Sequence, residues 1–276
     1  MAAWLVAASV PFVCGSPIAR RTKALSGSIG RSPEDYYEYS PSNMPDQHSF
    51  ATHTFATRLD CRYLLHTPET LEPDSLLVLT LHGYGSKPED QLRLTKLLLG
   101  ERHVIASLQA PNQHYANAGM PNAQSVAGYN WGIRPHWEAS VRLHHAMVRQ
   151  AFAELRNRFR LGPERCLLVG FSQPVGMNYR LVGTHPGEVA GVIGICGGVP
   201  RDWQEDKYQP VKAALLHISR DEDEFYPTAV VTKFAEQLRR HAADVEFHLM
   251  PGQHRFPSKA DKIVRPWIAR VFGTSI

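Results

Sequence analysis

A serine, a run of acidic residues and a histidine follow one another in the second half of the sequence, each shortly after an apolar stretch. They are Ser172, which follows the apolar stretch 166–171, the acidic residues 221–224, and His254. A serine hydroxyl attacks a carbonyl carbon only weakly unless a histidine takes its proton and a carboxylate orients that histidine. If the fold brings these groups together, they predict acyl transfer through an activated serine.

The turn that carries this serine has a second chemical feature. The sequence Gly170-Phe-Ser-Gln173 lies where a strand would pass sharply into a helix, which would hold the hydroxyl clear of the sheet. The start of that helix would offer free N–H groups and the positive end of its dipole to an oxyanion. The glycine-rich stretch His82-Gly-Tyr-Gly85 also leads from an apolar run into a helix. We therefore expect the backbone N–H groups of Tyr84 and Gln173 to form an oxyanion hole, with His82 bracing its turn through hydrogen bonds.

Each of these groups also has a purely structural explanation. A serine before a helix is most often an N-cap, so Ser172 alone would not establish a nucleophile. Within the run 221–224 any carboxylate could instead be a solvated loop charge. His217 and His248 fall inside predicted strands, where a histidine more often belongs to the core, whereas His254 follows the last strand. The choice among the four acidic residues stays open on these grounds.

The surrounding sequence predicts the elements that would position these groups. Apolar runs of strand length alternate with stretches whose apolar residues recur every three or four positions, which is typical of helices. Predicted strands cover 58–65, 76–81, 103–108, 166–171, 189–196, 213–218 and 245–250, and predicted helices cover 86–99, 137–159, 228–238 and 260–271. The first strand alternates in polarity and is expected to be antiparallel. The runs 76–81, 103–108, 166–171 and 189–196 are apolar on both faces, and 213–218 and 245–250 resemble a further pair of strands. This pattern predicts one α/β domain with a mostly parallel sheet and helices on both faces.

Two local details refine this prediction. Ser86 and Glu89 have the spacing of a capping box at the start of the helix 86–99, which Gly100 would end. The stretch 111–131 shows no period and is rich in Asn, Gly, Ala and Tyr. We expect it to be a loop that folds over the site.

Four motifs, in this order, resemble one known family. His82-Gly-Tyr-Gly85, Gly170-Phe-Ser-Gln173, Asp223 four residues before Pro227, and Gly252-Gln-His254 are similar to the motifs of the phospholipase/carboxylesterase family of α/β-hydrolases, which includes acyl-protein thioesterase-like enzymes. The resemblance covers about residues 55–273. It implies an α/β-hydrolase fold and a serine esterase that needs no cofactor and cleaves carboxylic esters or thioesters of modest size.

By position, the resemblance implies Ser172 as the nucleophile, Asp223 as the acid and His254 as the base. In the family the serine turn ends in glycine, where this chain has Pro174. Proline is tolerated in the first turn of a helix, and the expected oxyanion donor is Gln173. We therefore expect a working turn with altered packing of its helix.

Aromatic residues near these motifs could line a pocket for the acyl or aryl part of a substrate. The candidates are Tyr84, Tyr129, Trp131, Phe225, Tyr226 and Phe256. Core packing is an equally good explanation for each ring, because proteins use aromatic side chains for both purposes.

The composition narrows the class of protein. The chain has 276 residues, 43% of them hydrophobic, and a formal net charge of +4 at pH 7 with its basic residues scattered. This argues against a nucleic-acid-binding protein, and the length allows a substantial core. The four cysteines are widely spaced and include no Cys-x-x-Cys pair, which suggests neither a metal site nor a disulfide scaffold. We expect a monomer or homodimer that acts on a small-molecule ester.

The start of the chain differs from the rest. Residues 1–50 include a stretch rich in Ser and Pro without any period, which predicts a poorly ordered leader before a hydrolase domain at 51–276. The stretch 2–13 is apolar apart from Ser9, like a weak signal segment, yet no Lys or Arg precedes it and Pro11 interrupts it. No stretch approaches the roughly 20 apolar residues of a membrane span. We therefore expect a cytoplasmic protein, with a secreted or periplasmic one as the alternative.

The function predicted from the sequence is a carboxylesterase- or phospholipase-like serine hydrolase that cleaves carboxylic esters through an acyl-enzyme intermediate. Two alternatives stay open. Pro174 suggests a non-catalytic binding protein that keeps the hydrolase fold. The apolar start and the aromatic-containing loop suggest a secreted feruloyl- or depolymerase-type esterase.

Overall fold

The centre of the protein is a seven-stranded sheet with the strand order β1-β3-β2-β6-β7-β8-β9. The computed structural model describes residues 51–115, 122 and 124–274. The strands of this sheet are β1 (Tyr63–His66), β2 (Leu77–Leu81), β3 (Val104–Leu108), β6 (Cys166–Phe171), β7 (Gly191–Ile195), β8 (Ala214–Arg220) and β9 (Val245–Met250). Neighbouring strands are parallel, except that β1 pairs antiparallel with β3. The sheet is therefore mostly parallel, as its apolar strands predicted.

The chain divides into two compact units, Met1–Thr57 and Arg58–Ile276. Of the first unit the structure describes residues 51–57, which form neither helix nor strand. The leader expected over 1–50 lies outside the described residues, and its boundary with the hydrolase domain stays a prediction. The elements of the sheet and its helices all belong to the second unit.

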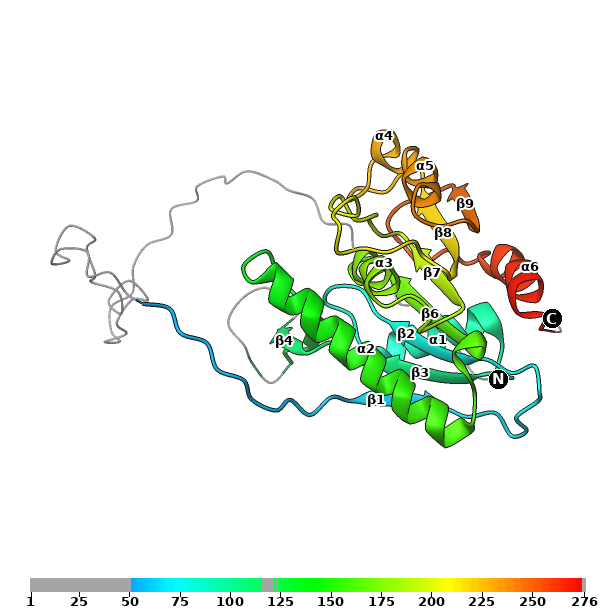
Figure 1. The fold of residues 1–276 in the computed structure, drawn as a ribbon, viewed down its shortest axis with the longest axis horizontal. Coiled ribbons are helices and arrows are strands. Elements are labelled where there is room, and N and C mark those ends of the chain that lie inside the picture. Colours follow the sequence, from blue (N-terminus) through cyan, green and yellow to red (C-terminus); the bar gives the residue numbers. More distant parts are fainter. Residues whose placement is uncertain (1–50, 116–121, 123, 275–276) are drawn as a thin grey trace, which may run out of the picture. The chain divides into compact units, whose positions relative to one another are not determined.

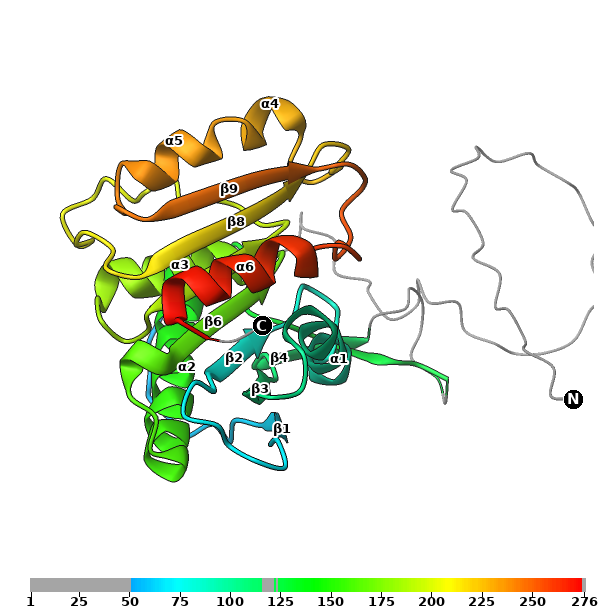
Figure 2. The ribbon, with the colours of Figure 1, turned by 90° about the vertical axis from the view of Figure 1, so that its right-hand side faces the viewer.

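Helices cover both faces of the sheet (Figures 1 and 2). One face carries α2 (Trp137–Phe159), α3 (Val175–Thr184), α4 (Thr228–Val231) and α5 (Phe234–Arg239), and the other carries α1 (Pro88–Leu99) and α6 (Asp261–Phe272). Each face has its own cluster of buried apolar side chains, with Phe152 of α2 in one and Trp267 of α6 in the other. Because both faces are covered, the side chains of β2 are buried along its whole length.

The topology gathers four turns at one edge of the sheet. In parallel strands the carboxyl ends lie at the same edge, so the segments that follow β2, β6, β8 and β9 meet there. These segments contain the candidate residues of the sequence analysis. Within the described residues, no helix is long and apolar enough to cross a membrane.

Two predicted elements differ in extent or continuity in the structure. The strand expected over 58–65 begins only at Tyr63, because Tyr63 pairs with Leu108, the last residue of β3, and the residues before it have no strand to pair with. The helix expected over 228–238 is divided into α4 and α5. Four of the five residues in 228–232 are β-branched, and such residues favour helix least after glycine and proline.

The capping box expected at the start of α1 is also wrong. Helix α1 begins at Pro88, and Lys87 holds the cap position without a side-chain hydrogen bond. Ser86 lies outside the helix because its backbone pairs with Tyr129. Gly100 ends the helix at φ 84°, as predicted.

The stretch 111–131 is not a simple loop. It contains a second, two-stranded antiparallel sheet made of β4 (Asn112–Tyr115) and β5 (Ala127–Asn130). Each strand has only four residues, and β4 is largely polar and exposed, so neither produces an apolar alternation in the sequence. The backbone of Gly85 donates to Tyr129, which joins this small sheet to the turn after β2.

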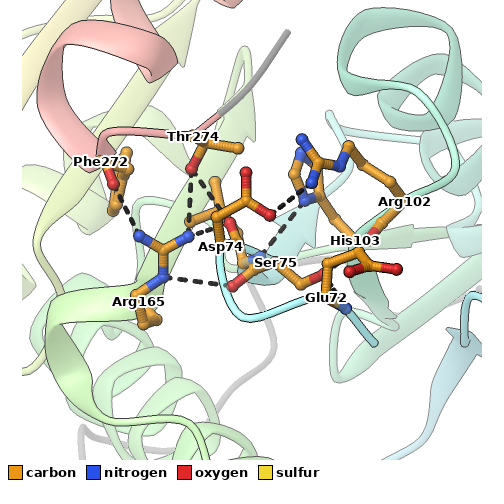
Figure 3. Close-up of polar contacts among 9 residues, drawn as sticks. Glu72, Asp74, Ser75, Arg102, His103, Arg165, Phe272 and Thr274 are labelled. Atoms are coloured by element: carbon orange, nitrogen blue, oxygen red, sulfur yellow. Dashed lines mark hydrogen bonds and ion pairs between the residues drawn. The ribbon is translucent and has the colours of Figure 1, made fainter. Parts of the chain in front are cut away.

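Arg165 lies at the other end of the strands, away from the four turns that follow β2, β6, β8 and β9 (Figure 3). It is the last residue of a short 3-10 helix, Pro163–Arg165, and directly precedes β6. Its guanidinium donates to the carbonyl oxygens of Asp74, Ser75 at 3.2 Å and Phe272 at 2.7 Å, and to the Thr274 hydroxyl at 3.1 Å. One side chain therefore joins the segment before β2, the start of β6 and the end of α6.

Replacing Arg165 with methionine should lower the free energy of unfolding by about 2 kcal/mol, because several charge-assisted hydrogen bonds to backbone carbonyls are lost together. Urea denaturation measures this loss. The control is Arg93→Met, since the Arg93 side chain is 72% exposed and its ion pair with Asp90 should contribute about 0.5 kcal/mol or less. Equal losses in the two variants would contradict a stabilising role for the Arg165 contacts.

Candidate active site

Ser172 sits on a strained turn directly after β6. Its φ is 62°, a left-handed conformation that is uncommon for residues other than glycine. The Ser172 carbonyl accepts from Val175, the first residue of α3, so the chain turns at once from strand into helix. Strain of this kind persists only where the surrounding structure holds it, and the turn has the geometry of a nucleophile elbow.

The turn after β2 packs against this elbow. A Cβ atom on Gly83 would lie 3.1 Å from the Phe171 ring and 3.3 Å from the Ser172 Cβ, so a larger residue would push the two turns apart. Strands β2 and β6 are also direct neighbours, with Leu81 opposite Gly170. The two glycine-containing motifs therefore meet, as the sequence predicted.

Ser172, His254 and Asp223 form one chain of hydrogen bonds. The Ser172 hydroxyl lies 2.8 Å from His254 Nε2, and His254 Nδ1 lies 2.7 Å from Asp223 Oδ2. The Asp223 carboxylate can only accept, so Nδ1 carries the imidazole proton and Nε2 is left to accept the hydroxyl proton. The Asp223 side chain is almost fully buried, and its other oxygen accepts the N–H groups of Phe225 and Tyr226, each at 2.9 Å.

The other acidic residues of this loop have different contacts. Asp221 accepts the Gly252 N–H at 2.7 Å, and Glu224 accepts the His254 N–H at 3.1 Å. The Glu222 N–H donates to the Gly252 carbonyl at 3.0 Å. These bonds fasten the backbone of the histidine loop to the acidic loop, while Asp223 alone contacts the imidazole among the four acidic residues.

The backbone contacts of Asp221 and Glu224 are not predictable from the sequence, where these residues stand only as rivals of Asp223 or as solvated charges. Hydrogen bonds to the N–H groups of Glu224 itself and of His254 hold the pKa of the Glu224 carboxyl below its ordinary value, so the acceptor stays ionised. The residues that these bonds join lie about thirty positions apart in the sequence, so no local pattern signals them.

The expected oxyanion donors are available at this edge. Among the described residues, the backbone N–H groups of Tyr84 and Gln173 donate to no protein acceptor. The buried ring of His82 holds the first of the two turns: its Nε2 accepts from the Ala110 N–H at 3.2 Å and its Nδ1 donates to the Gly83 carbonyl at 2.8 Å. Burial lowers the pKa of His82, which keeps the imidazole neutral for this bracing role.

Two of the predicted aromatic side chains flank His254. The Phe225 ring lies 4.8 Å from the imidazole and the Tyr226 ring 6.0 Å, measured between ring centres. Phe225 is 68% exposed, whereas Tyr226 is mostly buried, and burial raises the pKa of its hydroxyl. Phe225 is thus the ring beside the imidazole that is open to a ligand.

Within the described residues, none of the other four predicted aromatic rings contacts the His254 ring. The Tyr84 side chain is exposed beside His114, and Tyr129 lies in β5 with its ring 6.2 Å from that of His82. Phe256 packs near Phe171 and lines an apolar cavity of about 320 Å³ between α1 and the segment that leads into α6.

Trp131 does not line a pocket. Its side chain is completely buried in the larger apolar cluster, and its indole N–H donates to the His82 carbonyl at 2.8 Å. The expected substrate contact is therefore wrong for this residue, because a ring with no exposed surface has no face left for a ligand.

Pro174 occupies the position just before α3. Its φ of −74° suits the start of a helix, and its carbonyl accepts the Asn178 N–H at 2.8 Å. Since the first N–H groups of a helix have no partner within the helix, the missing N–H of proline removes no hydrogen bond here. Pro174 is therefore compatible with the hydrogen bond between Ser172 and His254.

The arrangement can move a proton from the Ser172 hydroxyl to the His254 imidazole. Within the described ranges, no cluster of three or more His, Cys, Asp or Glu side chains is placed to hold a metal ion. The chemistry that these side chains offer by themselves is nucleophilic attack on a polarised carbonyl.

Comparison with known proteins identifies the family of this chain. Residues 67–271 match the sequence profile of the phospholipase/carboxylesterase family. No curated protein sequence matches the chain.

Several solved esterase structures share the fold. The carboxylesterase of Bacillus cereus has a TM-score of 0.61 at 14% identity, covering 77% of this chain and 95% of that one. Esterase PE8 has a TM-score of 0.62 at 21% identity, covering 77% and 100%. A phospholipase/carboxylesterase from Dyadobacter fermentans has a TM-score of 0.57 at 19% identity, covering 80% and 99%.

At these identities the structures establish the fold, whereas the family match extends over most of the sequence. The sheet order, the elbow and the family match all agree. The protein thus belongs to the phospholipase/carboxylesterase family of α/β-hydrolases and is a hydrolase of the carboxylesterase type.

Proposed function

We propose that the protein hydrolyses small carboxylic esters through a covalent acyl-enzyme in which Ser172 is the nucleophile, His254 the general base and Asp223 the orienting acid. The observation that carries this proposal is the unbroken chain of hydrogen bonds from the Ser172 hydroxyl through the imidazole to the buried Asp223 carboxylate. Membership of the phospholipase/carboxylesterase family supports an ester as the substrate.

The first half of the reaction forms the acyl-enzyme. The Ser172 oxygen forms a bond to the ester carbonyl carbon while its proton passes to His254 Nε2, and the carbonyl electron pair moves onto oxygen. The N–H groups of Tyr84 and Gln173 stabilise that oxyanion. When the carbonyl reforms, the bond to the alcohol oxygen breaks, and His254 gives its proton to the leaving alcohol.

The second half restores the enzyme. A water molecule loses a proton to His254 and attacks the acyl carbon, and the second oxyanion lies against the same two N–H groups. Collapse of this intermediate breaks the bond to the Ser172 oxygen, which recovers its proton from His254 as the carboxylic acid leaves. The Asp223 carboxylate stabilises the imidazolium that forms in each half.

The proposal is tested with a series of p-nitrophenyl esters from acetate to palmitate, together with labelling by a fluorophosphonate. We expect hydrolysis of at least the short esters and a single stoichiometric label on folded protein. Folded protein that neither hydrolyses any ester of the series nor takes up the label would overturn the proposal and would favour a non-catalytic binding protein.

A further inference from the structure

Trp131 lies between the two turns that carry the proposed oxyanion donors. Its backbone N–H donates to Gln173 Oε1 at 2.9 Å, and Gln173 Nε2 donates to the next carbonyl, that of Gly132, at 2.7 Å. The Gln173 side chain therefore pairs with the backbone of 131–132 through both of its polar atoms. Meanwhile the Trp131 indole N–H donates to the His82 carbonyl at 2.8 Å.

Each oxyanion donor is the N–H group of a peptide plane. The carbonyl of that same plane accepts hydrogen bonds from nearby residues, which fix the orientation of the plane. The Gly83 carbonyl, which shares a plane with the Tyr84 N–H, accepts from His82 Nδ1 and from the Ser86 N–H. The Ser172 carbonyl, which shares a plane with the Gln173 N–H, accepts from Val175. These bonds set the direction of each donor but not the distance between the two.

Trp131 supplies a connection between the two planes. Its indole N–H donates a hydrogen bond to the segment that leads to Tyr84, and its backbone N–H donates one to the side chain of Gln173. The indole is completely buried, so its hydrogen bond to the His82 carbonyl is shielded from water, whereas the two bonds of the Gln173 side chain are partly buried. The single polar atom of the buried Trp131 side chain is hydrogen-bonded to the His82 carbonyl in the first turn. This side chain can therefore act as a rigid spacer between the two turns.

We propose that Trp131 and the side chain of Gln173 form a positioning brace that holds the two oxyanion-binding N–H groups at a fixed separation. The proposal rests on the function proposed above. Neither side chain touches the substrate; their effect passes through the Tyr84 and Gln173 backbones. An oxyanion is stabilised only when both donors lie within about 2.7–3.1 Å of its position, so a loosened brace weakens binding of the transition state more than binding of the ester.

The experiment removes hydrogen bonds of the brace while leaving an apolar side chain at each position. Trp131→Phe keeps a buried ring and deletes the indole N–H, and Gln173→Met keeps the length of the side chain and the backbone N–H. The matched control is Trp267→Phe, because Trp267 is equally buried, while its indole N–H has no partner in the described structure. Trp267 lies against Gly191, at the far end of β7 from the elbow.

Each variant is compared with wild type in kcat and KM for p-nitrophenyl butyrate and in the inhibition constant of a trifluoromethyl ketone. Such a ketone forms a tetrahedral adduct with serine, and the adduct oxygen occupies the oxyanion position. We expect both brace variants to lose about 10- to 100-fold in kcat, with KM changed less than about threefold and the ketone bound more weakly by a similar factor. The Trp267→Phe control should stay within about twofold of wild type.

The possible outcomes distinguish a failure of the brace proposal from a failure of the proposed esterase function. A kcat within about threefold of wild type in folded Gln173→Met would overturn the brace, whether or not Trp131→Phe folds. A fall in kcat without weaker ketone binding would also overturn it, because the loss would then lie outside the oxyanion hole. If wild-type protein itself hydrolyses no ester and takes no fluorophosphonate label, the proposed function fails before the brace is tested.

Discussion

Replacing Ser172 with alanine should lower kcat for p-nitrophenyl butyrate by roughly 10⁵-fold, the largest effect expected of any single substitution in this protein. Without the hydroxyl, His254 has no proton to take and no acyl-enzyme forms. The remaining rate would come from water attacking an ester that is still held near the Tyr84 and Gln173 N–H groups. The measurement is the steady-state release of p-nitrophenol.

The control for this loss is Ser258→Ala. Ser258 is an exposed serine outside the hydrogen-bonded chain, and its replacement should leave kcat within about twofold of wild type. Both variants should unfold at the wild-type temperature. A Ser172→Ala variant that hydrolyses the ester at the wild-type rate would show that another group is the nucleophile.

Replacing Asp223 with asparagine should lower kcat by about 10³- to 10⁴-fold, as expected when the orienting acid of such a triad is lost. One Asp223 oxygen accepts the backbone N–H groups of Phe225 and Tyr226, so the amide oxygen of asparagine is expected to take that place. The amide NH₂ would then face His254 Nδ1 and force the imidazole proton onto Nε2. In that tautomer Nε2 can no longer accept the proton of Ser172.

Asp221→Asn is the matched control within the same acidic loop. Asp221 accepts the Gly252 N–H, and an asparagine oxygen can accept the same bond, so we expect a loss of kcat of no more than about fivefold. A variant series in which Asp221→Asn lost more activity than Asp223→Asn would contradict the assignment of the acid.

Much of the fold could be predicted because its strands are short apolar runs separated by amphipathic helices. Strands β6 and β9 and helix α2 have the predicted bounds. The hairpin of β4 and β5 could not be found in this way, since polar strands of four residues have no apolar period. The division of α4 from α5 depends on the poor helix propensity of 228–232, which a period alone does not reveal.

The site residues that lie in recognisable sequence motifs could be predicted. The elbow motif and the turn after the last strand indicated Ser172 and His254, but the choice of Asp223 among four acidic neighbours depended on a family resemblance. The contacts of Asp221 and Glu224 with the histidine loop join residues about thirty positions apart, and no local pattern encodes them. The same holds for Trp131, whose indole contacts His82 after β2 and His144 of α2, residues that are distant from it in the sequence.

The most direct test of the account is to identify the residue that carries the acyl group during turnover. Wild-type protein is mixed with saturating p-nitrophenyl butyrate and quenched rapidly in acid, and its peptides are mapped by mass spectrometry. The account predicts a butyryl group on the peptide that contains Ser172, attached at that serine and absent from Ser172→Ala. A butyryl group found on any other residue of an enzyme that is hydrolysing the ester would contradict it.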